Sequence, residues 1–374
     1  MSSLKDLHKF GQSPWYDNIE RGLLLSGGLK KMVDEDGIAG VTSNPSIFEK
    51  AINGSQTYDT DIQKFSQQGE SVFGIYDELT TTDVSTAADI LANVHQTSKI
   101  DGYVSIEVSP HLAHETEKTV EEARRLFAKI NKQNIMIKIP ATKEGPAAIR
   151  QCIADGISVN VTLIFNLRHY RAITQAYIEG IKERIGKGLP VDNINSVASF
   201  FVSRIDTYVD KLLDAAISKE KDSAKRAELQ SLLGQAAVAQ SKVMYAEFRK
   251  LFFGQEFAKL RKKGANVQRF LLASTSTKNP KFSDIKYIEE LIGEGTINTI
   301  PQVTVDAFRD HGAAKSTLDE GLEEAKQVLT KLKGFGIDVE SVCQQIQDDG
   351  VQAFIDSYDK LIDSLENKRK KFIS

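Results

Sequence analysis

Polar and apolar residues alternate with a period of two in three short segments of the chain, residues 104–108, 135–140 and 159–163. Neighbouring side chains of a strand point to opposite faces, so the isoleucines of residues 135–140 share one face and Lys138 lies on the other. By the same rule Glu107 lies opposite a row of valine and isoleucine, and Asn160 and Thr162 lie opposite valine and leucine. The pattern predicts strands with one face for covering helices and one face of reactive side chains, as a closed parallel barrel requires.

Short apolar runs alternate with longer amphipathic stretches along most of the chain, which predicts repeated βα units and a parallel sheet. Further strands are predicted at residues 37–44, 197–202, 269–274 and 296–300. Helices are predicted at residues 115–131, 145–154 and 167–185, in helical insertions at about 46–99 and 204–263, and at the C-terminus at about 304–373 with a break at 334–336.

The insertion at residues 204–263 is expected to form two or three helices, with a solvated turn or face at residues 219–226. No linker rich in proline, glycine or serine divides the chain. We therefore expect residues 1–374 to fold as a single (β/α)8 TIM-barrel domain with additional helices.

The polar residues that stand out are predicted to lie at the ends of these strands or just beyond them. They are Asp17, Asn44, Glu107, Lys138, Asn160, Thr162, Ser199, Arg204 and Lys278. In a βα barrel the catalytic residues come from the C-terminal ends of several strands. The distribution therefore predicts one active site at that end of the barrel.

Lys138 is the only charged residue in its apolar strand, and two interpretations of it are open. A lysine at a strand end can extend its methylene stem and bring the ammonium group to solvent. Alternatively, the group is desolvated among isoleucine, methionine and proline, which favours the neutral amine that adds to a carbonyl. Glu107 is either a structural salt-bridge partner of a buried cation or a proton-transfer group. The pairing of the two residues favours the catalytic interpretation of each.

Composition narrows the classes of partner. The 374 residues include 48 basic and 51 acidic side chains, so we expect no polycationic face for nucleic acid, and an anionic ligand must meet local cations. No apolar run approaches the roughly 20 residues of a membrane span, and residues 1–7 have neither a secretory core nor a transit pattern. We expect a cytoplasmic protein without membrane partners.

Neither a disulfide framework nor a metal site is expected. Cys152 and Cys343 are far apart and lack metal-ligand spacing, which fits a reducing compartment and leaves their redox regulation open. His111 and His114 stand near Glu115, but this spacing is weak evidence for zinc.

Four motifs, taken in order, resemble those of transaldolases. They are residues 40–46 (GVTSNPS), 137–142 (IKIPAT), 160–165 (NVTLIF) and 299–301 (TIP). The resemblance covers roughly residues 13–312, and residues 274–280 (STSTKNP), together with the length, resemble the longer bacterial branch of that family. The role of the chain beyond residue 312 is left open.

The resemblance implies a Schiff-base mechanism without metal or organic cofactor. Lys138 would attack the ketone of a sugar phosphate, while Glu107 and Thr162 would hold a water that shuttles protons. Asp17 would take the proton of the C4 hydroxyl as the C3–C4 bond breaks. A dihydroxyacetone fragment would stay on Lys138 as an enamine until an aldehyde phosphate accepts it.

The same resemblance implies the substrate contacts. Asn44 and Asn160 would bind the hydroxyls of the fragment, and Arg204, Lys278 and the Ser199 hydroxyl would bind phosphate.

For four of these residues structural alternatives stay open. Asp17 could be a helix N-cap, Asn44 could shape a turn, Arg204 could pair with an acid, and Lys278 could lie in a solvated loop.

The sequence departs from the family pattern at two positions, Lys278 and Phe200. Lys278 replaces an arginine of many relatives outside this branch, so we expect the phosphate contact there to be monodentate. Phe200 replaces a common proline. Phe201 stands where related aldolases that hydrolyse the intermediate tend to have tyrosine, which favours transfer.

The predicted activity is transfer of dihydroxyacetone from sedoheptulose 7-phosphate to glyceraldehyde 3-phosphate in the pentose phosphate pathway. One alternative is a Schiff-base aldolase that releases free dihydroxyacetone. Another is a catalytically silent barrel that binds phosphosugars or a protein through residues 204–263. The oligomeric state, monomer or homodimer, and the preference among acceptors stay open.

Overall fold

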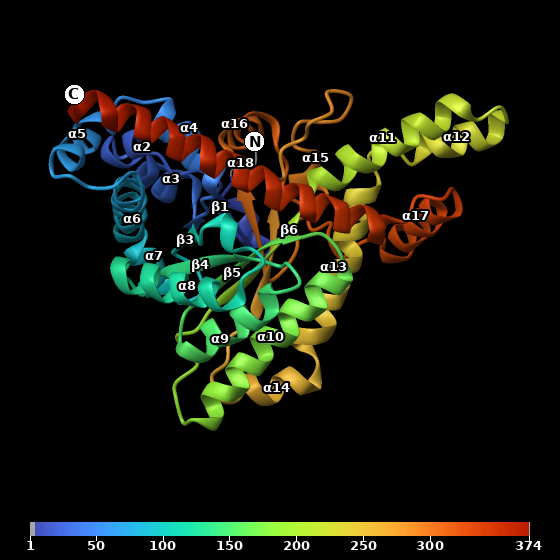
Figure 1. The fold of residues 1–374 in the computed structure, drawn as a ribbon. Helices are drawn as coiled ribbons and strands as arrows, with labels where there is room; N and C mark the ends of the chain where they lie inside the picture. Colours follow the sequence, from blue (N-terminus) through green and yellow to red (C-terminus); the bar gives the residue numbers. More distant parts are fainter. Residues whose placement is uncertain (1–3, 374) are drawn as a thin grey trace.

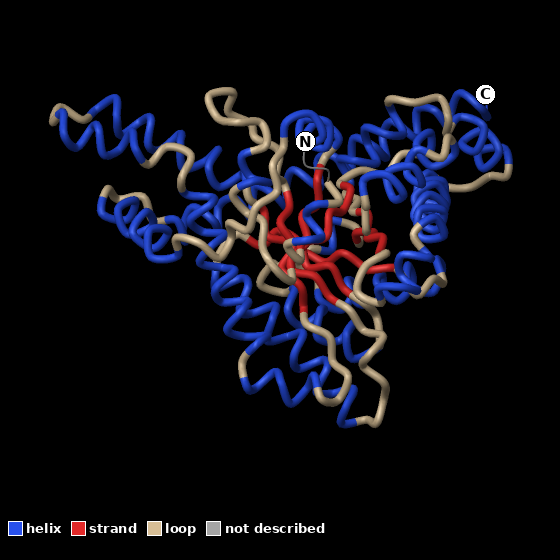
Figure 2. Tube along the Cα trace, turned by 180° about the vertical axis from the view of Figure 1, so that it is seen from behind, coloured by secondary structure: helices blue, strands red, loops and turns tan. Residues whose placement is uncertain are grey.

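The computed structural model describes residues 4–373 and contains a closed barrel of eight parallel strands, in which β1 pairs with β8. Residues 1–3 of the predicted N-terminal segment and residue 374 of the predicted domain range lie outside the described residues. The strands gather at the centre and helices surround them (Figure 2). The strands are β1 (Gln12–Tyr16), β2 (Gly40–Val41), β3 (Tyr103–Glu107), β4 (Ile135–Pro140), β5 (Val159–Ile164), β6 (Ser196–Phe201), β7 (Gln268–Ala273) and β8 (Thr296–Ile300). The predicted (β/α)8 barrel is confirmed.

Helices follow the strands, as the amphipathic stretches predict (Figure 1). Up to β6 they are α1 (Asp6–Lys9), α2 (Arg21–Leu25), α3 (Gly28–Asp36), α4 (Pro45–Asn53), α5 (Asp59–Gln67), α6 (Val72–Ile90), α7 (Ala92–Ser98), the 3-10 helix η1 (Pro110–Leu112), α8 (Thr116–Ile130), α9 (Gly145–Asp155) and α10 (Leu167–Gly186). Beyond β6 they are α11 (Ser203–Lys219), α12 (Ser223–Ser231), α13 (Ala236–Phe253), α14 (Gln255–Arg261), α15 (Lys286–Glu289), α16 (Gln302–His311), α17 (Leu322–Gly334) and α18 (Val339–Ile373). No helix among residues 4–373 is long and apolar enough to cross a membrane.

Two predicted elements differ from the observed ones. The stretch 204–263 holds four helices, α11 to α14, where two or three were predicted. Asp222 starts α12 by accepting the backbone N–H groups of Ala224 and Lys225, and Gly254 separates α13 from α14. The exposed residues between α11 and α12 lie in the charge run that was expected to be a turn or solvated face.

The strand predicted at residues 37–44 is reduced to β2, Gly40–Val41. A Cβ atom at Gly40 would lie 2.4 Å from Trp15 Cδ2, so the indole ring of β1 packs directly on the glycine backbone. Backbone hydrogen bonds continue on either side of β2, because Ala39 N–H donates to Pro14 and Thr42 N–H donates to Tyr16. These hydrogen bonds fix the positions of Thr42 and Asn44, which follow β2 at the C-terminal end of the barrel.

Strand register aligns three of the predicted site residues. Glu107 on β3 pairs with Lys138 on β4, and Lys138 pairs with Asn160 on β5. Leu163 interrupts the next pairing, because the β5–β6 register shifts between Val161 and Ile164 and Leu163 has φ +58°. A positive φ is strained for leucine, and such strain concentrates near functional sites.

The C-terminal helix α18 crosses the molecule above the strands and reaches α4 and α5 (Figure 1). Its residues Leu361 and Leu365 are fully buried, and the Ser357 hydroxyl hydrogen-bonds that of Ser46 on α4 at 2.7 Å. The segment beyond residue 312, whose role the sequence left open, thus contains a long helix laid over the barrel.

Candidate active site

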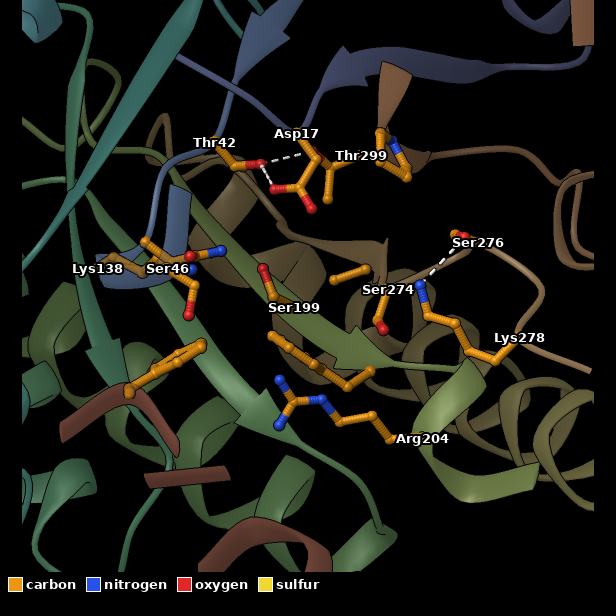
Figure 3. Close-up of a pocket in the computed structure, with 15 residues that line it drawn as sticks. Asp17, Thr42, Ser46, Lys138, Ser199, Arg204, Ser274, Ser276, Lys278 and Thr299 are labelled. Carbon is orange, nitrogen blue, oxygen red and sulfur yellow. Dashed lines mark hydrogen bonds between the residues drawn. The ribbon is translucent and has the colours of Figure 1, made fainter. Parts of the chain in front are cut away.

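A cavity of about 170 Å³ opens at the C-terminal ends of the strands, and we call it the inner cavity. Figure 3 shows its labelled side chains pointing toward one another from several strand ends. Its lining includes six of the predicted site residues, namely Asp17, Asn44, Lys138, Ser199, Arg204 and Lys278. A larger outer cavity of about 610 Å³ shares Asp17, Asn44, Arg204 and Lys278 with it. The strand-end residues therefore meet at one place, as their positions predict.

Lys138 points into the barrel and is only 4 % exposed, so the interpretation as a lysine extending to solvent is wrong. Its Nζ lies 3.2 Å from Glu107 Oε2 and donates a hydrogen bond of 3.1 Å to the carbonyl oxygen of Ser43. The sequence analysis paired Lys138 with Glu107, and strand register places this carboxylate beside the amine, where the two groups can exchange a proton.

Glu107 is buried, and burial raises the pKa of its carboxyl group while Lys138 lowers it. Two buried oxygens of the site retain capacity for a further partner, because Thr162 Oγ1 has no hydrogen bond among residues 4–373 and Glu107 Oε2 has only its ion pair with Lys138. Buried polar atoms nearly always have partners, often an ordered water. A water bound by these two groups fits the donor and acceptor atoms that they offer.

Asn160 and Ser199 are linked inside the barrel. Ser199 Oγ donates to Asn160 Oδ1 at 2.7 Å, and Asn160 Nδ2 donates to Ser105 Oγ at 2.9 Å. The single proton of the Ser199 hydroxyl is therefore directed at Asn160. The contacts favour Ser199 as a residue that orients the amide, whereas the sequence suggested a phosphate contact.

Asp17 follows β1 and receives a hydrogen bond of 2.7 Å from Thr42 Oγ1. Thr42 Oγ1 also lies 2.6 Å from Thr299 Oγ1. Since Thr42 has one hydroxyl proton, Thr299 donates to Thr42 while Thr42 donates to Asp17. Burial raises the pKa of Asp17, whereas the Thr42 hydrogen bond and the nearby lysines, Lys138 and Lys278, lower it. The N-cap alternative for Asp17 is wrong, because α2 begins at Arg21 with Glu20 before it.

Arg204 has no ion pair or hydrogen bond among residues 4–373, so the alternative that it pairs with an acid is wrong. Its guanidinium lies over the rings of Phe201 and Phe354, at 5.3 and 5.8 Å from their centroids. Burial lowers the pKa of Arg204, and Glu107 opposes this effect. A partly buried cation without a carboxylate partner is suited to bind an anionic ligand.

Lys278 lies at the exposed rim, where Nζ donates to Ser276 Oγ at 3.1 Å. Partial burial lowers the pKa of Lys278, and repulsion from Lys50 and Arg204 adds to the effect. Lys278 is neither fully solvated nor paired with an acid, so the alternative that it lies in a solvated loop is only partly right. An entering anion would relieve the repulsion between these cations.

Comparison with known proteins decides the family. The family described as Transaldolase/Fructose-6-phosphate aldolase matches residues 14–365. This chain belongs to that family. A protein named Transaldolase from Trichodesmium erythraeum is 44 % identical over 98 % of both chains. Another named Transaldolase 2 from Nostoc sp. is 42 % identical over 99 % of this chain and 98 % of its own length, and a Transaldolase from Mycobacterium ulcerans is 41 % identical over 97 % and 96 %.

Within this family's site, Asn44 has a structural task as well as access to the cavity. Its Oδ1 caps α4 by accepting the N–H of Ile47 at 3.0 Å, so the turn alternative is partly right. Its amide NH2 group has no hydrogen-bond partner among residues 4–373 and remains for a ligand. Both uses of the side chain fit its position between β2 and α4.

Several residues of the inner cavity were not singled out from the sequence. Its lining also includes Thr42, Ser46, Ser274, Ser276, Thr299 and Phe354. All of these except Phe354 lie within motifs that resemble the family, so their signal was present. Phe354 comes from α18, and no local pattern indicates that this helix reaches the barrel mouth.

The described part of the chain contains no group of three His, Cys, Asp or Glu side chains arranged to hold a metal ion. His111 contacts Asp359 at 2.7 Å and His114 contacts Glu144 at 2.9 Å, each at the surface. The two histidines therefore contact different surface carboxylates and do not face a common site.

Proposed function

We propose that this enzyme is a transaldolase that moves a dihydroxyacetone unit from sedoheptulose 7-phosphate to glyceraldehyde 3-phosphate. The products are erythrose 4-phosphate and fructose 6-phosphate, as in the non-oxidative pentose phosphate pathway. The observation that carries the proposal is the buried Lys138 amine, 3.2 Å from Glu107 in a cavity that also holds the unpaired Arg204 guanidinium.

Lys138 is the nucleophile. Glu107, whose pKa is raised by burial, takes a proton from the ammonium and leaves the neutral amine that attacks the substrate ketone. Loss of water from the carbinolamine then requires proton delivery to its hydroxyl. Glu107 and Thr162 hold the water that delivers it, and the buried Thr162 hydroxyl, which has no hydrogen bond among residues 4–373, supports this assignment.

Asp17 is the base for carbon–carbon cleavage. It takes the proton of the C4 hydroxyl, the C3–C4 bond breaks, and its electrons move into the protonated imine on Lys138. An aldose phosphate leaves, and the enamine of dihydroxyacetone stays bound. Thr42 holds the Asp17 carboxylate in place for this step.

The remaining polar residues bind substrate. The amides of Asn44 and Asn160 bind hydroxyls of the three-carbon fragment, and the hydrogen bond from Ser199 orients Asn160. Arg204 and Lys278 bind the phosphate of donor and acceptor. Their separation from acidic partners supports this role, since a charge-assisted contact with phosphate is then not lost to an existing salt bridge.

Reductive trapping tests the proposal. Borohydride added with fructose 6-phosphate should reduce the imine and leave a three-carbon adduct on the peptide that contains Lys138, detected by mass spectrometry. Lys138→Ala should lose the adduct, and Lys143→Ala, a change at an exposed lysine nearby, should keep it. An adduct on another residue, or none with any ketose phosphate, would remove the mechanism.

We place the enzyme in the cytoplasm as part of this proposal. Cys152 and Cys343 are free and buried, and the Cys343 thiol donates to the carbonyl oxygen of Phe165 at 3.2 Å. Burial raises the pKa of Cys152 to about 12 and also raises that of Cys343. Thiols of this kind are inert in the core and fit a protein that uses no disulfide.

A further inference from the structure

Phe354 of α18 forms part of the wall of the inner cavity, far along the chain from the strand-end residues. It is 3 % exposed, and its ring centroid lies 5.6 Å from Lys138 Nζ and 5.8 Å from the Arg204 guanidinium carbon. The ring thus borders both the amine that forms the imine and the cation that faces the phosphate. An apolar ring at this position supplies no proton to either group.

Specific contacts hold α18 against the barrel at this point. Gln347 Nε2 donates to the carbonyl oxygens of Ala141 and Leu163 at 2.9 and 2.8 Å. Ala141 follows β4, and Leu163 is the strained residue at which the β5–β6 register shifts. Because the β5–β6 pairing is interrupted at Leu163, its carbonyl oxygen can accept the hydrogen bond from Gln347 on α18. Gln347 thereby fixes the helix to the ends of the two strands that carry Lys138 and Asn160.

A glycine allows the close approach of the helix. A Cβ atom at Gly350 would lie 3.1 Å from both Arg204 Nη1 and Leu163 Cδ2. Glycine inside a helix destabilises it by roughly 1 kcal/mol relative to alanine, so its presence here fits a need for space. The backbone of α18 therefore lies directly on the mouth of the barrel.

The two cavities are lined by different residues of α18. Ile346, Asp349 and Ala353 line the outer cavity, whereas Phe354 lines the inner one. The outer cavity is the larger, about 610 Å³ against about 170 Å³, and it adjoins the inner one at shared residues that include Asp17, Arg204 and Lys278. Removal of the ring would enlarge the space beside Lys138 and leave room there for water.

We propose that Phe354 is a specificity-determining residue that selects an aldehyde acceptor over water for the three-carbon fragment held on Lys138. The inference rests on the proposed transaldolase function and adds a role for the C-terminal helix. The competing reaction begins when the enamine takes a proton from solvent at its nucleophilic carbon and becomes an iminium ion. Water then adds to the iminium carbon, the carbon–nitrogen bond breaks, and free dihydroxyacetone and the Lys138 amine result. The ring limits this reaction by filling the space through which water reaches the iminium carbon.

The test compares two rates in the full chain supplied with fructose 6-phosphate. One is the release of free dihydroxyacetone without acceptor, and the other is the formation of sedoheptulose 7-phosphate with erythrose 4-phosphate present. Phe354→Ala should raise the ratio of release to transfer by about tenfold or more, and Phe354→Leu by a smaller factor. Phe354→Leu keeps most of the apolar volume and serves if the alanine variant does not fold.

Leu361→Ala is the matched control, because Leu361 is fully buried on the same helix but does not line either cavity. It should leave the ratio near that of the unchanged enzyme. An unchanged ratio in both Phe354 variants, or an equal rise in Leu361→Ala, would overturn the inference. Failure of the proposed function looks different, because the unchanged enzyme would then form neither the borohydride adduct nor any transfer product.

Discussion

Two arginines lie at opposite ends of the barrel, and only Arg269, at the N-terminal end, has an acidic partner among residues 4–373. There Arg269 donates to Asp101 at 2.8 Å, to Ser13 at 2.7 Å and to the Thr296 carbonyl at 2.8 Å. Asp101 also accepts from Trp15 Nε1 at 3.0 Å. At the C-terminal end the Arg204 guanidinium has no acidic partner in the described part of the chain.

The contrast separates structural from functional use of the same residue types. A satisfied buried ion pair fixes the surrounding structure, and breaking it leaves an uncompensated charge. A polar group without a partner in the protein can form hydrogen bonds or ion pairs with a ligand. In this barrel Arg269 ties β7 to β1 and β8, whereas Arg204 extends from the start of α11 into the cavity.

The largest effect is expected from Lys138→Ala at the functional end. Removal of the nucleophile should lower kcat by about 10⁴-fold or more, the scale seen when a covalent catalyst is removed. Sedoheptulose 7-phosphate formation in a coupled assay measures this loss. Circular dichroism should show an intact barrel, and a variant that retains more than a few per cent of activity would contradict the Schiff-base role.

Arg269→Ala should act on the other side of the comparison. Loss of the guanidinium leaves Asp101 buried without its cation, so the unfolding free energy should fall by about 3–5 kcal/mol. Urea denaturation measures the change, and kcat at a temperature where the variant is folded should match the unchanged enzyme. A large loss of kcat without loss of stability would break the division between the two ends.

Arg204→Ala should raise KM for fructose 6-phosphate by about 10–100-fold, for a loss of about 1.5–3 kcal/mol of charge-assisted hydrogen bonding. The fold should be unaffected, because no ion pair within residues 4–373 is broken. Fructose without phosphate is the control substrate, and its use should change little. Equal losses with both sugars would show that Arg204 does not bind phosphate.

Lys278→Ala should raise KM for fructose 6-phosphate by a smaller factor than Arg204→Ala, because Lys278 lies at the rim.

The smallest effect is expected from Thr42→Val. The Thr42 hydrogen bond lowers the pKa of Asp17, so its removal should raise that pKa further. Asp17 must be deprotonated to act as a base, so activity should be lost at a higher pH as the pH falls. The pH profile of kcat measures this shift, with kcat at neutral pH reduced by less than about tenfold. Thr42→Ser keeps the hydroxyl and should keep the profile, and an unshifted profile for valine would argue against Asp17 as the base.

Much of the site could be predicted because its information is local. Period-two alternation in three segments placed Lys138, Glu107 and Asn160 on inward faces, and strand register then aligned them. The direction of individual protons could not be predicted in this way. Ser199 donates to Asn160 only because β5 and β6 are neighbours at that level of the barrel.

Other features depend on contacts between distant parts of the chain. The approach of Phe354 to Lys138 joins residues more than 200 positions apart, and nothing in the period of α18 indicates which structure it covers. The shortening of β2 depends on the packing of Trp15 against Gly40. The extra helix within residues 204–263 begins at an N-cap, Asp222, inside a charged run. An aspartate at this place is a local signal for a helix start, and the prediction of two or three helices did not include it.

The pairing of β1 with β8 also bears on how the chain is made on the ribosome. Gln12 pairs with Thr296, so the first strand must wait for most of the protein to be synthesised before the barrel closes. At about 5–20 residues per second this delay lasts roughly 15–60 s. During that time one side of β1 has no strand to pair with. Pro14 at its centre offers no N–H donor, and this reduces the chance that another nascent chain adds to the open edge.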